Sequence, residues 1–117
     1  VGGITESMKV AGWCESHYID MMPHNPLGPI CTAASIHFGA SVPNFAWLET
    51  RESAAENAGF TNDEIIKSSH YMENAMYVVS KEPGLGISVN EDYLKNSKFK
   101  QWDPPQLERN DGSVTNW

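Results

Sequence analysis

Two side chains that can transfer protons stand at matching positions in the first half of the chain, each directly after a short apolar segment. His24 follows residues 19–23, and Glu49 follows residues 45–48. In parallel α/β folds, ligands meet the carboxyl ends of the strands. A histidine there transfers protons near neutral pH, and a carboxyl group binds metal, relays protons or donates a hydrogen bond to a developing oxyanion. This pattern favours an acid–base site built from both residues.

Simpler roles for these two residues remain open. His24 could be a loop histidine bonded to a neighbouring carbonyl group, and Glu49 could be a solvated strand end paired with Arg51. A metal site made of Asp20, His24 and Glu49 is rejected. The four residues of extended chain from Asp20 to His24 span about 13 Å, which is too far for shared ligation.

The remaining candidate groups favour structural roles. His17 and His37 fall within predicted helices, and His70 falls in a polar loop. The motif Gly84-x-Gly86 lacks the third glycine and the strand–turn–helix context of a dinucleotide site. The two cysteines form neither a disulfide framework nor a zinc site.

Helices and strands alternate around the two candidate residues. The pattern predicts a helix over 5–18, an extended segment over 19–23, a helix over 30–41 and a buried strand over 45–48. Such alternation implies parallel βα units. A closed (β/α)8 barrel takes about 250 residues. We therefore expect the chain to be the tail of something larger, or one piece of a split protein.

The second half of the chain has shorter elements. A capping box from Thr61 to Glu64 predicts a helix over 62–69, and strands are expected over 75–80 and 87–89, separated by a turn. Asn90 is expected to cap a helix over 91–95. From residue 97 onward Pro, Asn, Asp and Gly dominate, with Trp102 and Trp117 as isolated anchors.

The composition disfavours several classes of function. The 117 residues carry 8 Lys+Arg against 15 Asp+Glu, a net charge of −7, so no nucleic-acid partner is expected. No stretch approaches the roughly 20 apolar residues that span a bilayer, so no membrane partner is expected. With 40% apolar residues the chain is globular in composition. The absence of a visible signal peptide and of a disulfide framework favours a cytoplasmic location.

Several motifs resemble the acid-sugar dehydratases of the mandelate racemase group in the enolase superfamily. The likeness covers nearly the whole chain, is weakest over 50–75, and is greatest toward galactonate dehydratases. It identifies the chain as the C-terminal part of such an enzyme. The motifs are Gly2-Gly3-Ile4-Thr5-Glu6, Pro23-His24-Asn25-Pro26-Leu27-Gly28-Pro29, residues 44–49, Lys81-Glu82-Pro83-Gly84-Leu85-Gly86 and Asp111-Gly112-Ser113-Val114-Thr115-Asn116-Trp117.

The resemblance implies an α/β fold, the C-terminal part of a modified (β/α)7β TIM-like barrel with a tail that returns to an α+β capping domain. Residues 19–24 would be the seventh strand and residues 45–49 the eighth. Residues 1–70 would form the last βα units of the barrel, and residues 71–117 would pack on the capping domain.

The resemblance also implies a reaction, the Mg²⁺-dependent dehydration of an aldonic sugar acid, galactonate- or gluconate-like, to a 2-keto-3-deoxy acid. His24 matches the base that removes the proton α to the carboxylate, and Glu49 matches the carboxyl group that stabilises the enediolate. Asn25 could contact substrate hydroxyl groups. The family's metal ligands lie on strands outside this chain, so no metal site is expected within it. The isolated 117 residues are expected to be inactive and not to fold stably.

The implied partners are a small-molecule sugar acid, the rest of the barrel and the capping domain. The resemblance also implies a homo-oligomer, of which an octamer is one possible form. Three alternatives remain. The first is another enolisation of the superfamily, by a racemase or a cycloisomerase. The second is a non-catalytic fragment that only packs against a partner, and the third is an independent small acidic binding domain. Detection of a keto acid separates dehydration from racemisation.

Overall fold

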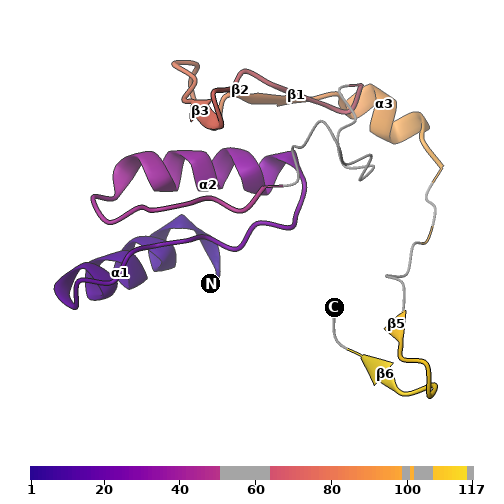
Figure 1. The fold of residues 1–117 in the computed structure, drawn as a ribbon. Coiled ribbons are helices and arrows are strands. Elements are labelled where there is room, and N and C mark those ends of the chain that lie inside the picture. Colours follow the sequence, from indigo (N-terminus) through magenta and orange to yellow (C-terminus); the bar gives the residue numbers. More distant parts are fainter. Residues whose placement is uncertain (51–63, 99–100, 102–106, 116–117) are drawn as a thin grey trace.

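Three helices and a set of short strands make up the part of the chain that the structure, a computed structural model, describes: residues 1–50, 64–98, 101 and 107–115. Figure 1 shows α1 on one side of α2 and the β2–β3 hairpin on the other, with the β5–β6 hairpin apart from both helices. The elements in chain order are α1 (Gly3–Ser16), α2 (Pro29–Ser41), β1 (Ile66–Ser68), β2 (Tyr71–Glu73), β3 (Met76–Val78), β4 (Ile87–Val89), α3 (Glu91–Asn96), β5 (Leu107–Glu108) and β6 (Val114–Thr115).

The first helix begins earlier than the sequence predicts. Its N-cap is Gly2, which offers no side chain to the first turn, so the helix starts two residues before the predicted start at residue 5. Gly3 takes φ +85°, a conformation that glycine adopts without steric penalty. The backbone conformation that Gly3 adopts therefore allows α1 to start before the predicted residue.

The second helix confirms the predicted segment to within one residue. It begins at Pro29, whose fixed φ and missing N–H suit the first turn. The face toward the rest of the chain is buried at Thr32, Ala33, Ile36 and Phe38. A Cβ at Gly39 of this helix would lie 2.9 Å from the Phe45 ring, so the chain at residue 45 approaches the helix backbone closely.

The two extended segments of the first half run parallel, as the alternation of elements predicts. Met21 and Phe45 form a parallel bridge. The Met21 N–H donates to the Asn44 carbonyl oxygen at 2.6 Å, and the Ala46 N–H donates to the Met21 carbonyl oxygen at 2.9 Å. The predicted strands over 19–23 and 45–48 are therefore present as paired extended chain, but the second is not buried as predicted, because Phe45 and Trp47 are 38% and 73% exposed.

The apolar core of the described residues is small. Ala11 of α1 packs with Phe38 and Val42 around α2, and Met21 packs against this cluster. Large apolar side chains elsewhere face outward; Trp13 and Trp47 are 71% and 73% exposed. None of the described helices is long and apolar enough to cross a membrane.

The second half departs from the prediction at its first element. Residues 66–68 form β1, which pairs antiparallel with β4, so the helix predicted over 62–69 is wrong within the described residues. Ile66 lies opposite Val89 in this pair. The predicted strand over 75–80 is confirmed as the shorter β3, and α3 is confirmed with the Asn90 side chain accepting from the Tyr93 N–H. The division at residues 70 and 71 stays a prediction.

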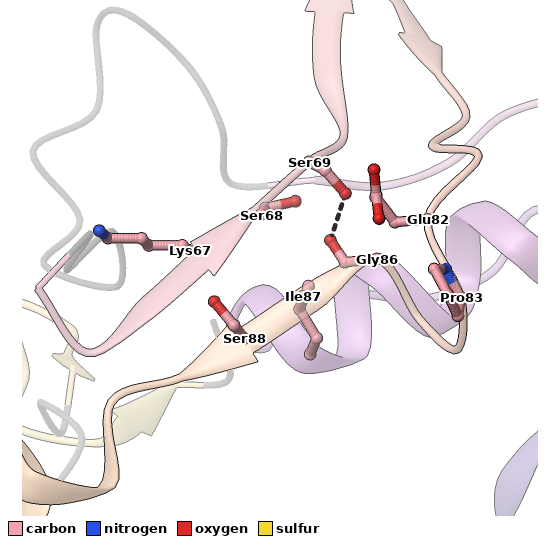
Figure 2. A pocket seen from close by; sticks show the side chains of 8 residues that line it. All are labelled: Lys67, Ser68, Ser69, Glu82, Pro83, Gly86, Ile87 and Ser88. Carbon is pink, nitrogen blue, oxygen red and sulfur yellow. Dashed lines mark hydrogen bonds between the residues drawn. The ribbon is translucent and has the colours of Figure 1, made fainter.

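A buried histidine holds the turn between β3 and β4. His70 is 8% exposed. Its Nδ1 accepts from the Ser80 N–H at 3.1 Å, which leaves Nε2 to donate to the Leu85 carbonyl oxygen at 2.8 Å. The Ser69 hydroxyl donates to the Gly86 carbonyl oxygen (Figure 2). His70 is therefore a structural residue of a folded turn, where the sequence predicted a polar loop.

The tail contains a hairpin that the sequence did not predict. Strands β5 and β6 pair antiparallel. The Asp111 carboxylate closes the turn between them, accepting from the Ser113 N–H at 3.0 Å and the Ser113 hydroxyl at 2.7 Å. The predicted anchors Trp102 and Trp117 lie outside the described residues.

Candidate active site

The register of the parallel segments brings the two predicted site residues together. The Glu49 N–H donates to the Pro23 carbonyl oxygen at 3.4 Å, so the segments end at the same level. The side chains that follow meet: His24 Nδ1 lies 2.6 Å from Glu49 Oε2. Matching positions at the ends of parallel strands thus place the histidine and the carboxyl group in contact, as their spacing predicts.

The hydrogen bonds around Glu49 fix the tautomer of His24. The Asn25 backbone N–H donates to Glu49 Oε2 at 3.0 Å. A carboxylate oxygen that already accepts from an amide acts as an acceptor toward the ring, so Nδ1 carries the proton. When the ring is neutral, this contact therefore leaves the lone pair on Nε2, in a ring that is 81% exposed. The arrangement gives His24 an open nitrogen that can accept a proton.

The pair is exposed and contributes little to stability. The His24 side chain is 81% exposed and that of Glu49 is 42% exposed. A contact between two exposed polar side chains contributes at most about 1 kcal/mol to stability. The contact therefore does little to hold the fold together, and what it does provide is a fixed ring orientation and an ordered carboxyl group at an accessible edge.

Asn25 lies on the other side of its segment. Successive residues of extended chain point to opposite faces, and the burial alternates accordingly, with His24 exposed and Asn25 at 0% exposure. The Asn25 Nδ2 donates to Thr32 Oγ1 at 2.9 Å, and its Oδ1 is buried without a partner among the described residues. This burial gives no support to the predicted contact of Asn25 with substrate, which stays a prediction.

The residues present do not fit a metal site. Among residues 1–50, 64–98, 101 and 107–115, no three His, Cys, Asp or Glu side chains converge. His24 and Glu49 supply two groups, and Mg²⁺ prefers octahedral oxygen ligation. Asp20, which the sequence argument excluded, does not join them.

Two hollows lie away from the His24–Glu49 pair. One, of about 470 Å³ and mainly apolar, is bounded by α2, residues 45–50 and the β2–β3 hairpin, and the Thr50 and Tyr77 hydroxyl groups meet beside it at 2.8 Å. The other, of about 340 Å³, lies between β1, β4 and the turn that His70 holds (Figure 2). Neither is lined by His24 or Glu49, so the pair stands on an open edge.

Comparison with known proteins assigns the chain to a family. Residues 1–93 match the family described as enolase C-terminal domain-like. The chain belongs to this family. The result confirms the likeness to the enolase superfamily that the Gly-Gly-Ile-Thr-Glu and Pro-His-Asn-Pro-Leu-Gly-Pro motifs carry.

Similar enolase-superfamily sequences include dehydratases. D-galactonate dehydratase of Xanthomonas campestris pv. campestris (strain B100) is 33% identical over 120 residues, which cover 99% of this chain and 31% of the relative. D-galactonate dehydratase of Cronobacter sakazakii is 31% identical over the same share of each chain. This enolase C-terminal domain-like chain thus spans about a third of the length of these relatives.

Solved structures of the superfamily share the fold. An enolase from Agrobacterium radiobacter, with bound sodium and L-malate, superposes with a TM-score of 0.77 at 26% identity, over 97% of this chain and 31% of its own. An enolase from Pantoea ananatis, with bound D-gluconate and magnesium, superposes with a TM-score of 0.65 at 29% identity, over 79% of this chain and 21% of its own. The described residues therefore have the fold of an enolase C-terminal part.

Sequence reasoning missed one residue of this region. Thr32 lies in the first turn of α2 and accepts from the buried Asn25 side chain. The position of Thr32 in the first helical turn is visible in the sequence, three positions after Pro29, but its contact with Asn25 is not.

Proposed function

We propose that this chain is the C-terminal part of an enzyme that dehydrates an aldonic sugar acid, galactonate- or gluconate-like, to a 2-keto-3-deoxy acid in a Mg²⁺-dependent reaction. The observation that carries the proposal is the 2.6 Å contact between His24 Nδ1 and Glu49 Oε2, which leaves Nε2 open at an exposed edge. The D-galactonate dehydratase relatives and the D-gluconate bound to the Pantoea ananatis enolase support this substrate class.

In this proposal His24 is the base. Its Nε2 lone pair takes the proton from the carbon α to the substrate carboxylate, and the electron pair left behind forms the enediolate. A proton so close to a carboxylate is very weakly acidic, so a positioned base and preorganised donors are both needed. The contact with Glu49 holds the ring in the tautomer that this step requires.

Glu49 stabilises the intermediate. Its Oε2 is occupied by the His24 ring and the Asn25 amide, and the side chain is 42% exposed. A proton on Oε1 would be donated as a hydrogen bond to the negative charge that develops on the substrate carboxylate. The departure of the 3-hydroxyl group needs an acid that lies outside this chain.

The metal and the remaining groups come from outside the described residues. Since these residues do not fit a Mg²⁺ site, we propose that its ligands lie on the rest of the barrel, and the Pantoea ananatis enolase with bound magnesium supports the choice of ion. Exposed apolar side chains such as Trp13, Met22 and Trp47 suit coverage by that barrel and the capping domain. Assembly into a homo-oligomer and a cytoplasmic location belong to the same proposal.

The test is a product assay on the complete polypeptide that carries these residues. A panel of aldonic acids is incubated with Mg²⁺, and keto acid is detected as its semicarbazone. We expect keto acid from at least one aldonate, and none after His24→Asn, which keeps the size of the side chain but removes the base. His17→Asn, the same change at an exposed histidine at the end of α1, is the control and should leave turnover unchanged. A panel without product would contradict the proposal.

A further inference from the structure

We infer that Asn25 and Thr32 are positioning residues that aim the Glu49 carboxyl group at His24, an inference that rests on the proposed function. Asn25 makes two contacts in opposite directions. Its backbone N–H donates to Glu49 Oε2 at 3.0 Å, and its side-chain Nδ2 donates to Thr32 Oγ1 at 2.9 Å. The residue therefore links the exposed acid–base pair to the buried start of α2.

The inner end of this link is fixed. Asn25 is 0% exposed and Thr32 is 6% exposed. The Thr32 N–H donates to the Gly28 carbonyl oxygen at 3.1 Å, which is the first hydrogen bond of α2, and Pro29 sets the direction of that first turn. A hydroxyl group held by a helix backbone has little freedom, so Thr32 is a rigid anchor for the Asn25 amide.

The outer end of the link needs such an anchor. The Glu49 side chain is 42% exposed and has several rotatable bonds, so in solvent it would sample many rotamers. The Asn25 N–H selects the rotamer that also meets His24. If Thr32 releases the Asn25 side chain, the peptide group that carries this N–H is free to rotate, and both Glu49 and the ring lose their common orientation.

The substitution that tests this link is Thr32→Val in the complete polypeptide. Valine keeps the branched shape but removes the acceptor for Asn25 Nδ2. We expect kcat with the best aldonate to fall about 10- to 100-fold while KM changes little, because misplacing a catalytic group by about 1 Å can cost 100-fold. Thr32→Ser keeps the hydroxyl group and should stay within about threefold of the parent protein.

A double-mutant cycle separates positioning from general damage to the fold. If Thr32 acts through the Glu49 carboxyl group, Thr32→Val should lower kcat by less than about twofold in a protein that already carries Glu49→Gln. An equal loss in both backgrounds would overturn the inference. Thr32→Ala is the second variant, for use if Thr32→Val does not fold, since it removes the same acceptor without adding a methyl group.

A readout without turnover keeps the inference separate from the proposed reaction. The Asn25 amide resonance in a ¹⁵N–¹H spectrum reports on its hydrogen bond to Glu49. We expect this resonance to move on Glu49→Gln and on Thr32→Val, and to stay in place on Thr32→Ser. An Asn25 amide resonance that does not shift on Thr32→Val would overturn the positioning role of Thr32. A moved resonance in a protein that dehydrates no aldonate would overturn only the proposed function.

Discussion

At the scale of single residues, Glu49 Oε2 is the point where the two parallel segments meet. It contacts His24 Nδ1 at 2.6 Å and accepts from the Asn25 N–H at 3.0 Å. Shortening the Glu49 side chain to the Cβ methyl group of alanine removes the contact that orients the His24 ring. It also removes the donor for the developing oxyanion. We expect Glu49→Ala to lower kcat about 100-fold or more. Steady-state kinetics of the complete polypeptide measure this, with Glu15→Ala on the exposed side of α1 as the control.

Asp111 provides a second residue-scale prediction, this time on pH. The Ser113 hydroxyl and then the Ser113 N–H donate to the carboxylate and lower the pKa of Asp111 below its ordinary 3.8. A lowered pKa stabilises the hairpin above pH 3.8, and this contribution is lost as the pH falls through the lowered value. We expect Ser113→Ala to raise the pKa of Asp111 toward 3.8, as followed by an NMR titration of its carboxyl carbon. A titration unchanged by Ser113→Ala would contradict this role.

The sequence could predict those parts of the site that depend on local patterns, and it could not predict the contact between Asn25 and Thr32. His24 and Glu49 were predictable, because each ends an apolar segment and parallel strands end at one edge. The burial of Asn25 was not predicted: the resemblance implied a contact with substrate hydroxyl groups, whereas the residue next to the exposed histidine on extended chain points the other way. The Thr32 contact depends on where α2 begins in space, and spacing alone does not determine that.

At the scale of elements, the turn between β3 and β4 shows what packing adds to backbone conformation. Gly84 and Gly86 both have positive φ, +69° and +65°. A Cβ at Gly84 would meet nothing within 4 Å, whereas one at Gly86 would lie 2.9 Å from the Ser69 hydroxyl oxygen and from Ser80 Cβ. The two glycines therefore separate the effect of the left-handed conformation from that of close approach.

The matched pair Gly84→Ala and Gly86→Ala tests this distinction. Gly84→Ala should cost about 1–2 kcal/mol in the free energy of unfolding, because of the left-handed conformation alone. Gly86→Ala should cost at least about 1 kcal/mol more, since the methyl group overlaps two serine side chains. Urea denaturation of the complete polypeptide measures both. Equal costs would contradict the close approach of Gly86 to Ser69 and Ser80.

The elements that the sequence predicted poorly depend on distant partners. Residues 62–69 carry a capping-box pattern, which is a local signal for a helix. Within the described residues, Ile66 instead pairs with Val89, more than 20 positions away. The two-residue strands β5 and β6 are too short to show a period of their own. By contrast, Pro29 and Asn90 signal helix starts through their own side chains, and α2 and α3 were predicted well.

At the scale of the whole molecule, the described chain is extended and exposes large apolar side chains. Its radius of gyration is 17.0 Å, against about 13 Å for a compact domain of this length. Large apolar side chains, Trp13, Tyr18 and Trp47 among them, are more than two thirds exposed. We expect the isolated 117 residues to lack a cooperative unfolding transition and to bind hydrophobic dyes. A sharp two-state transition in urea would contradict this and favour an independent domain.

The most direct test of the role of His24 is the exchange of the substrate α-proton. The complete polypeptide is incubated with its aldonate and Mg²⁺ in D₂O, and deuterium at the α-carbon of recovered substrate is followed by NMR beside keto-acid formation. If His24 Nε2 is the base, the parent protein and the His17→Asn control exchange or eliminate the α-proton. In His24→Asn, the rates of both exchange and dehydration should fall at least about 100-fold. Exchange or dehydration at the parent rate in His24→Asn would contradict the assignment.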